Sequence, residues 1–112
     1  MTIYEKPTCT TCRKVNKLLE EKGINLDKVN YYVQPFTEQK LKNLLKKMNM
    51  TAVELLRKRE KAIKSINVEK ETEENIIKMM IKNPDLIERP IIEMGNKAIL
   101  ARPPEKISEL LD

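Results

Sequence analysis

Two cysteines, Cys9 and Cys12, stand three residues apart near the start of the chain, and they are its only cysteines. A short apolar strand pattern precedes them, and a helical pattern begins at them and ends at Gly23. A cysteine in the first turn of a helix faces unpaired backbone N–H groups and the positive end of the helix dipole, which favour the reactive thiolate. The spacing therefore predicts redox or nucleophilic chemistry, and the alternative is a buried structural pair of thiols.

Length and composition narrow the class of protein. The 112 residues suit a single domain over residues 1–112, and 35% of them are charged. We expect no membrane segment, because no apolar run approaches the roughly 20 residues that a spanning helix needs, and no secretory signal is visible. A reactive cysteine pair without a disulfide framework favours a cytoplasmic location. With two Cys and no His, the chain predicts neither a metal site nor an organic cofactor.

The net charge of +5 does not by itself indicate nucleic-acid binding. The lysines are scattered along helical patterns beside glutamates, and the aromatic residues amount to three Tyr and one Phe. A nucleic-acid surface would combine a basic stripe with stacking aromatics. We therefore expect no direct binding of nucleic acid.

The elements that must position the cysteines follow from hydrophobic periodicity and capping residues. Residues 57–71 are polar and predict only short helical turns and loop. The other patterns predict a strand at 3–4, a helix from 9 to 22, a strand at 26–33, helices after Thr37, at 51–56 and after Thr72, a hairpin of strands at 90–94 and 97–101, and a last helix from Pro104.

This order is β-α-β, then a helical insert at about 37–83, then β-β-α. It predicts an α/β chain of thioredoxin-like fold with a four-stranded mixed sheet. The first two strands should be parallel through a right-handed crossover, and the terminal hairpin antiparallel. The cysteines would then lie at the carboxyl end of the first strand, where open α/β sheets bind ligands.

Three arginines, Arg57, Arg89 and Arg102, stand at loop or boundary positions. A guanidinium group presents a planar fork of donors that suits an anion with several oxygens. Convergence beside Cys9 would create a pocket for a tetrahedral oxyanion, with Thr10 and Thr11 adding donors at the helix start. Taken singly, each arginine is more often a surface charge or an ion-pair partner, and threonines at a helix start are often only caps.

Four segments with cysteine or arginine positions follow one another along the chain: Lys6-Pro7-Thr8-Cys9-Thr10-Thr11-Cys12-Arg13, Leu55-Leu56-Arg57-Lys58, Glu88-Arg89-Pro90-Ile91 and Leu100-Ala101-Arg102-Pro103. Together they resemble the markers of the ArsC family, the glutaredoxin-linked arsenate reductases and their relatives. The resemblance covers essentially the whole chain.

The resemblance implies a role for each matching residue. Cys9 corresponds to the nucleophile that attacks arsenate, and the arsenic–sulfur adduct is then reduced by thiols to arsenite. Arg57, Arg89 and Arg102 correspond to the arginines that hold the oxyanion and stabilise the thiolate. In thioredoxin-like folds a cis-proline faces the redox cysteine, which makes Pro90 the candidate.

The chain differs from the family pattern at two positions. Glu5 stands where family members carry a histidine, and a carboxylate close to Cys9 would raise the pKa of that thiol. Cys12 stands where glutaredoxin-linked enzymes usually have no cysteine. Its presence implies that Cys9 could be resolved within the chain as a Cys9–Cys12 disulfide, which leaves two alternatives for the electron donor: a protein such as thioredoxin, or glutaredoxin with glutathione.

Two other functions fit the same residues. The Spx regulators share the C-x-x-C pattern, bind RNA polymerase and use the disulfide as a redox switch. They lack an arginine matching Arg102 and differ around Arg57, so these two positions favour the enzyme. The second alternative is a general thiol–disulfide reductase without specificity for an oxyanion.

Overall fold

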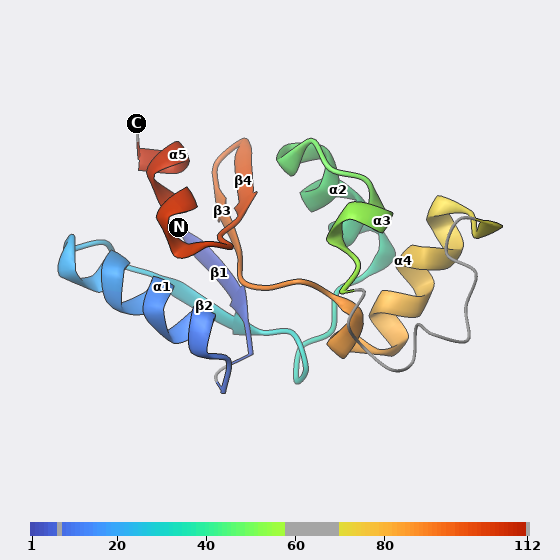
Figure 1. Ribbon diagram of the computed structural model, residues 1–112, viewed down its shortest axis with the longest axis horizontal. Helices are drawn as coiled ribbons and strands as arrows, with labels where there is room; N and C mark the ends of the chain where they lie inside the picture. The colour runs from blue at the N-terminus through green and yellow to red at the C-terminus, as the bar shows by residue number, and fades with distance from the viewer. Residues whose placement is uncertain (7, 58–69, 112) are drawn as a thin grey trace. The chain divides into compact units, whose positions relative to one another are not determined.

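The two ends of the sequence come together in one sheet in the computed structural model, which describes residues 1–6, 8–57 and 70–111 (Figure 1). The chain divides into two compact units, and the predicted insert at 37–83 falls within the second. Unit 1 is Met1–Gln34 with Arg89–Asp112, and unit 2 is Pro35–Glu88. Most of the polar region at 57–71 lies outside the described residues.

The sheet of unit 1 is mixed, as predicted. Its strand order is β2-β1-β3-β4, with β1 parallel to β2 and antiparallel to β3, and with β3 antiparallel to β4. Ile3 on the central strand β1 pairs with Lys28 on one side and Ile92 on the other. The strands are β1 (Thr2–Glu5), β2 (Asp27–Asn30), β3 (Ile91–Met94) and β4 (Lys97–Leu100).

The strand predicted at 26–33 is shorter than expected, because β2 ends at Asn30. The side-chain oxygen of Asn30 accepts a hydrogen bond from the Tyr32 backbone N–H at 3.0 Å, and its backbone oxygen accepts from Val33 and Gln34. Asparagine favours such turns because its side chain can replace a backbone partner. The turn leaves Val33 75% exposed and Tyr31 buried, so their alternation with Val29 does not mark strand faces.

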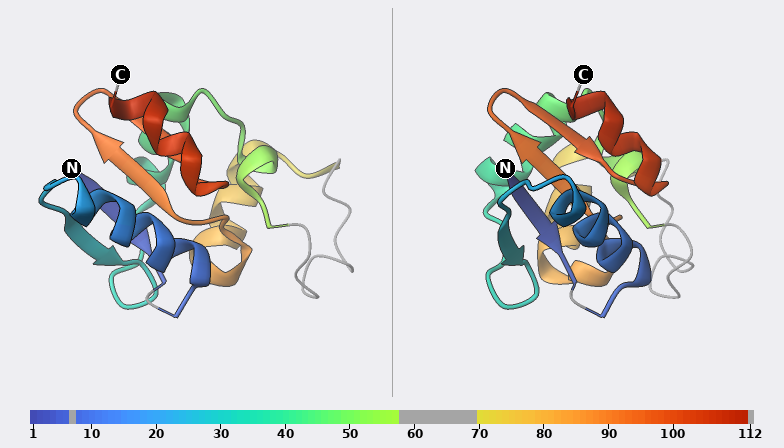
Figure 2. Two further views of the ribbon diagram at one scale, coloured as in Figure 1. Left: turned by 60° about the vertical axis from the view of Figure 1, so that its left-hand side comes forward. Right: turned by 90° about the vertical axis from the view of Figure 1, so that its left-hand side faces the viewer.

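Helix α1 (Thr10–Glu21) covers one face of this sheet together with η4 (Pro104–Ile107) and α5 (Ser108–Leu111) (Figure 2). Gly23, at φ +74°, ends α1 where a side chain would be strained. Because Leu19 is fully buried, Leu19→Ala should cost about 2–5 kcal/mol. The core cluster between helices and strands contains Ile3, Val15, Leu19, Ile92, Ala101, Ile107 and Leu110.

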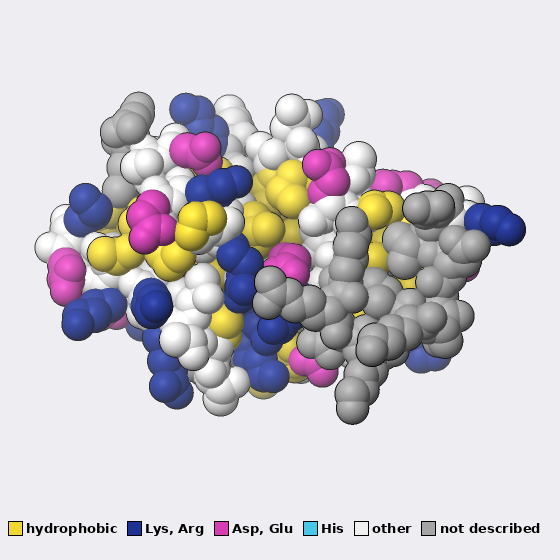
Figure 3. All heavy atoms as spheres, viewed as in Figure 1, with side chains coloured by type: hydrophobic (Ala, Val, Ile, Leu, Met, Phe, Trp, Pro, Cys, Tyr) yellow, Lys and Arg dark blue, Asp and Glu magenta, His cyan; other side chains and the backbone are white. Residues whose placement is uncertain are grey.

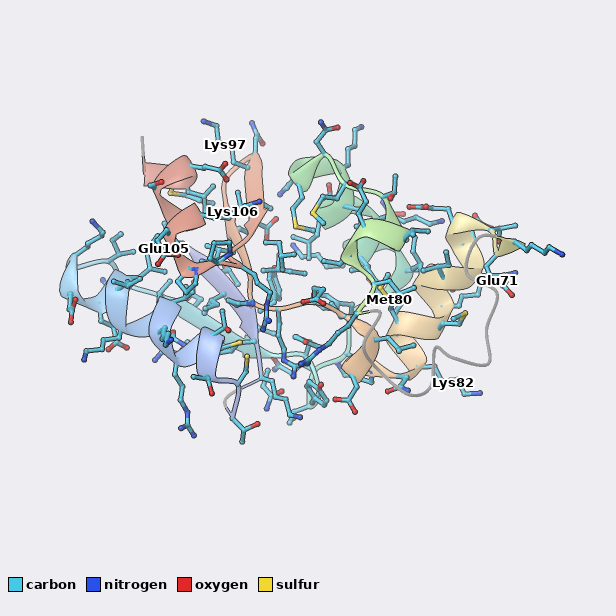
Figure 4. The ribbon with its side chains drawn as sticks, in the orientation of Figure 1. Glu71, Met80, Lys82, Lys97, Glu105 and Lys106 are labelled. Atoms are coloured by element: carbon cyan, nitrogen blue, oxygen red, sulfur yellow. The ribbon has the colours of Figure 1, made fainter. Side chains whose placement is uncertain are left out.

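Unit 2 is helical, and its helix starts were predicted correctly from their caps. Thr37 and Thr72 accept hydrogen bonds from Lys40 and Asn75, and Thr51 forms a capping box with Glu54. Met80 is a fully buried residue of α4 (Figure 4). The elements are α2 (Glu38–Met48), α3 (Ala52–Leu55), α4 (Glu73–Lys82) and η3 (Pro84–Leu86).

On the face shown in Figure 3, Lys and Arg side chains are interspersed with Asp and Glu side chains over unit 1. In the part of the chain that the structure describes, none of the helices is both long enough and apolar enough to cross a membrane.

Candidate active site around Cys9

Cys9 lies at the point where the loop after β1 turns into α1. It is the N-cap residue of the helix, with extended backbone angles of φ −76° and ψ 126°. Its backbone N–H donates to the Lys6 carbonyl at 2.9 Å, and its carbonyl accepts the first helical hydrogen bond from Arg13 at 3.0 Å. The half-buried thiol therefore sits beside backbone N–H groups that have no partner within the helix. This is the position that the sequence predicted.

Two of the three predicted arginines lie at this thiol. Nη2 of Arg102 is 3.9 Å from the Cys9 sulfur, and Nε of Arg102 donates to the Arg89 carbonyl at 3.1 Å. Arg89 is only 7% exposed and interacts electrostatically with the Cys9 thiolate. Two guanidinium groups and a thiolate thus form one cluster within unit 1.

The β3–β4 hairpin explains why these two arginines meet. Arg89 comes just before β3 and Arg102 comes just after β4. Since the strands are antiparallel, their outer ends lie together, and the Ala101 N–H donates to the Pro90 carbonyl at 2.9 Å. The Arg89–Pro90 and Arg102–Pro103 peptide bonds are both cis.

The surroundings of Cys9 stabilise its thiolate. Burial alone would raise its pKa, but the Cys12 backbone N–H, the Cys12 thiol and the Arg89 guanidinium outweigh burial and lower the pKa to about 7. At neutral pH, about half of the Cys9 side chains are therefore ionised. The charge of Arg89 is stabilised as well. Burial alone would lower the pKa of Arg89, but the Cys9 thiolate and the nearby tyrosines raise it above the ordinary value.

Cys12 has the opposite character. Its side chain is fully buried on α1, and both cysteines are free thiols. Burial raises the pKa of Cys12 to about 12, and the charges of Cys9 and Glu5 act in the same direction. Cys12 therefore stays protonated at neutral pH while Cys9 ionises.

Glu5 is buried, with 5% of its surface exposed, and it contacts Asn16 of α1. Its Oε2 accepts a hydrogen bond of 2.6 Å from Nδ2 of Asn16. A carboxylate close to Cys9 was expected to raise the pKa of that thiol, but the net shift of Cys9 is downward. The carboxylate acts on Cys12, because its charge helps to keep that thiol protonated.

Two tyrosines of the site were not found from the sequence. The Tyr32 hydroxyl accepts a hydrogen bond from Nη1 of Arg89 at 3.3 Å, and the Lys6 ammonium lies 4.9 Å from the centre of the Tyr32 ring. Tyr31 is buried, and burial raises its pKa above the usual range. The sequence pattern assigned both residues to a strand, whereas in the structure the turn after Asn30 brings them to Arg89.

The remaining predicted residues lie at two places. Thr10 and Thr11 form the first turn of α1 next to Cys9, where their roles as donors stay a prediction. Arg57 belongs to unit 2, where its backbone N–H donates to the Leu86 carbonyl at 2.7 Å. Its role in binding an oxyanion also stays a prediction.

A cysteine at the N-terminus of the first helix and a mixed sheet of order β2-β1-β3-β4 define a thioredoxin-like protein. The ArsC family profile matches residues 4–110, and the chain belongs to the ArsC family. The arsenate reductase of Vibrio cholerae has the same fold, with a TM-score of 0.90, 30% identity and 97% of each chain covered.

Three curated relatives show how broad the similarity is. The chain is 38% identical to YfgD of Escherichia coli K12, covering 97% of this chain and 94% of the relative. It is 32% identical to the arsenate reductase of Haemophilus influenzae, covering 97% of each. It is 31% identical to the global transcriptional regulator Spx 1 of Oceanobacillus iheyensis, covering 82% of this chain and 72% of the relative.

Proposed function

We propose that this chain is a thiol-dependent oxidoreductase that reduces arsenate or a closely related oxyanion. The observation that carries the proposal is the cluster of Cys9 with Arg89 and Arg102, in which a thiolate of pKa about 7 stands beside two guanidinium groups. Such groups bind anions with several oxygens through charge-assisted hydrogen bonds. Nε of Arg89 is buried without a hydrogen-bond partner among the described residues.

The reaction would proceed in two steps with Cys9 as nucleophile. In the first, the Cys9 thiolate attacks arsenic, an As–S bond forms, and one arsenate oxygen takes up a proton and leaves as water. In the second, the Cys12 sulfur attacks the Cys9 sulfur and loses its proton to solvent. The S–S bond forms as the As–S bond breaks, and its electron pair leaves with arsenic. Arsenic(V) becomes arsenic(III), and two thiols become one disulfide.

The opposite pKa shifts of the two cysteines support this order. One cause of the high pKa of Cys12 is the negative charge on Cys9. Forming the As–S bond moves that charge from the Cys9 sulfur to the arsenate oxygens, which the arginines would hold, so Cys12 becomes easier to deprotonate after the first step. In this scheme Cys12 stays protonated until the As–S adduct on Cys9 has formed.

The disulfide must then be reduced from outside the chain. The proposed donor is a dithiol protein of the thioredoxin type, or glutaredoxin with glutathione. The reaction needs a reducing compartment, which makes the cytoplasm the proposed location.

The direct test measures the alkylation rate of Cys9 against pH, with and without arsenate, in the reduced chain. We expect a midpoint near pH 7 and protection by arsenate. A coupled assay with arsenate and each donor should then give turnover that Cys9→Ser removes. The matched control is Lys82→Gln, which removes a positive charge from the end of α4 in unit 2.

The same experiment separates the enzyme from a general thiol–disulfide reductase. An oxyanion reductase should lose arsenate protection on replacement of Arg89 or Arg102, whereas a general reductase should show no protection to lose. A midpoint near that of free cysteine, unmoved by arsenate, would contradict the proposal. The Arg57→Gln variant tests whether the third arginine joins the site.

The second candidate is a redox switch that binds RNA polymerase. The similarity to Spx 1 and the presence of both cysteines favour it. Its test is a pull-down with the C-terminal domain of the polymerase α-subunit, using the oxidised and the reduced chain. Stable binding that depends on the disulfide, together with absent arsenate turnover, would establish the switch in place of the enzyme.

A further inference from the structure

A second concave site lies on unit 1, between α1 and the edge strand β2. It is a cavity of about 530 Å³, lined from three elements: Glu5 of β1, Asn16 and Lys17 of α1, and Lys28 and Asn30 of β2 among others. Among the described residues, its lining includes neither Cys9 nor either arginine of the proposed oxyanion site. The chemistry proposed above makes no use of this cavity.

The buried groups in its lining are acceptors. Glu5 is more than nine-tenths buried, and Asn16 provides its hydrogen bond at 2.6 Å. Nδ2 of Asn16 also donates to the Cys12 carbonyl at 3.0 Å. These two contacts fix the orientation of the amide, because a flipped amide would place its oxygen against two other acceptors. Oδ1 of Asn16 is consequently buried without a hydrogen-bond partner among the described residues.

The rest of the lining is largely cationic. Arg13 and Lys17 are exposed residues of α1 that line the cavity, and Lys28 forms an ion pair with Glu20 at 3.1 Å. A metal ion would find only one buried carboxylate here and would be repelled by these cations. A simple anion would be repelled by Glu5. The lining instead combines a buried carboxylate and one buried amide oxygen that needs a donor with exposed cations that attract an anion.

We propose that this cavity binds a small zwitterion of the class formed by free amino acids and short peptides. The ammonium group would donate to the Glu5 carboxylate and to Oδ1 of Asn16. The carboxylate group would lie at Arg13 and Lys17. An ammonium fits because it carries three donors and no acceptor, so that it matches two neighbouring acceptor groups at once.

The site adjoins the redox helix through Asn16, which contacts both Glu5 and the Cys12 carbonyl. Burial is the main reason why Cys12 is protonated, and an ammonium bound at Glu5 would offset the smaller contribution of the Glu5 charge. Occupation of the cavity would therefore make Cys12 a better nucleophile, which couples the two sites without a change of fold.

The test is a titration of the full reduced chain followed by 1H–15N NMR, with three probes: glycylglycine, N-acetylglycylglycine, which lacks the ammonium, and glycylglycinamide, which lacks the carboxylate. We expect glycylglycine to shift the Asn16 side-chain amide signals in a saturable way. The acetylated probe should bind at least about tenfold more weakly, and the amide probe severalfold more weakly.

Variants locate the two ends of the probe. Glu5→Gln should weaken glycylglycine binding by about tenfold, and Glu109→Gln, an exposed residue of α5 outside the cavity, should leave it unchanged. If Glu5→Gln does not fold, Lys17→Ala replaces it. That variant should weaken binding of glycylglycine and leave glycylglycinamide unaffected. Equal shifts with all three probes, or no saturable shift, would overturn the proposal. Arsenate turnover is measured separately, so either outcome leaves the proposed function to its own test.

Discussion

The two cysteines at the start of α1 interact with each other, yet their surroundings move their pKa values in opposite directions. At Cys9, burial is outweighed by the Cys12 backbone N–H, the Cys12 thiol and the Arg89 guanidinium, and the pKa of this thiol falls to about 7. At Cys12, burial raises the pKa of the thiol to about 12, and the charges of Cys9 and the Glu5 carboxylate act in the same direction. The side chains are chemically identical and only three residues apart. The comparison teaches that backbone N–H groups at the helix start, burial and neighbouring charges together separate the two pKa values, and in the proposed reaction Cys9 attacks and Cys12 resolves.

Replacing the attacking sulfur should have the largest effect. Cys9→Ser should lower arsenate turnover by about a thousandfold or more, because an alcohol at this site is scarcely ionised at neutral pH. Cys12→Ser should instead retain arsenate protection of Cys9 and block only the formation of the disulfide. Mass spectrometry of the alkylated and oxidised chains distinguishes these outcomes. Equal loss of arsenate protection in both variants would show that the two sulfurs are not functionally separate.

Removing a cation near Cys9 should reduce the difference between the pKa values of the two cysteines. Arg89→Gln should raise the pKa of Cys9 by about one unit or more, because a neighbouring charge and a hydrogen bond are both lost. The pH dependence of alkylation measures this value. Lys82→Gln should leave the midpoint in place, and an unmoved midpoint in Arg89→Gln would assign the low pKa to the helix backbone alone.

The two cysteines should also give opposite pH dependence of stability. Since the pKa of Cys9 is lower in the folded chain than its ordinary value of 9.0, its contribution is full above pH 9 and is lost as the pH falls toward 7. After allowance for solvent screening we expect about 1 kcal/mol. The pKa of Cys12 is raised, so its contribution is present below pH 9 and is lost toward pH 12. Urea unfolding at pH 6.5 and 9, with Cys9→Ser as the reference, measures the first of these.

Removing the Glu5 carboxylate should also reduce the difference between the two pKa values, this time through Cys12. Glu5→Gln should lower the pKa of Cys12, by about one unit, because one of the charges that oppose its thiolate is gone. The Cys9 midpoint should move much less. Titration of 13C-labelled cysteine signals reports both values in one sample. An equal change at the two cysteines would mean that Glu5 acts on the helix as a whole.

The smallest effect is expected at Tyr32, which supports Arg89. Tyr32→Phe removes the hydroxyl that accepts a hydrogen bond of 3.3 Å from Nη1 of Arg89. We expect a loss of about 0.5–1.5 kcal/mol in the free energy of unfolding and a slight rise in the pKa of Cys9. Combining Tyr32→Phe with Arg89→Gln should give less than the sum of the two effects. Full additivity would show that the contact does not help to position the guanidinium.

The sequence was sufficient to predict those features that depend on residues close together along the chain. Cys9 at the start of α1, Gly23 at its end, the capping threonines of unit 2 and the hairpin at Gly95 all follow from hydrogen bonds and backbone angles within a few residues. The order of these elements was enough for the thioredoxin-like sheet, because handedness and short connections leave few alternatives.

Tertiary structure decided which charges the two thiols meet. Arg89 and Arg102 are thirteen residues apart and come together only because the β3–β4 hairpin aligns its ends. Tyr32 joins them because Asn30 forms a turn where the alternating pattern predicted a strand. Glu5 reaches Asn16 across the packing of β1 against α1. These contacts depend on strand register and on burial, and neither is encoded in the spacing of two cysteines.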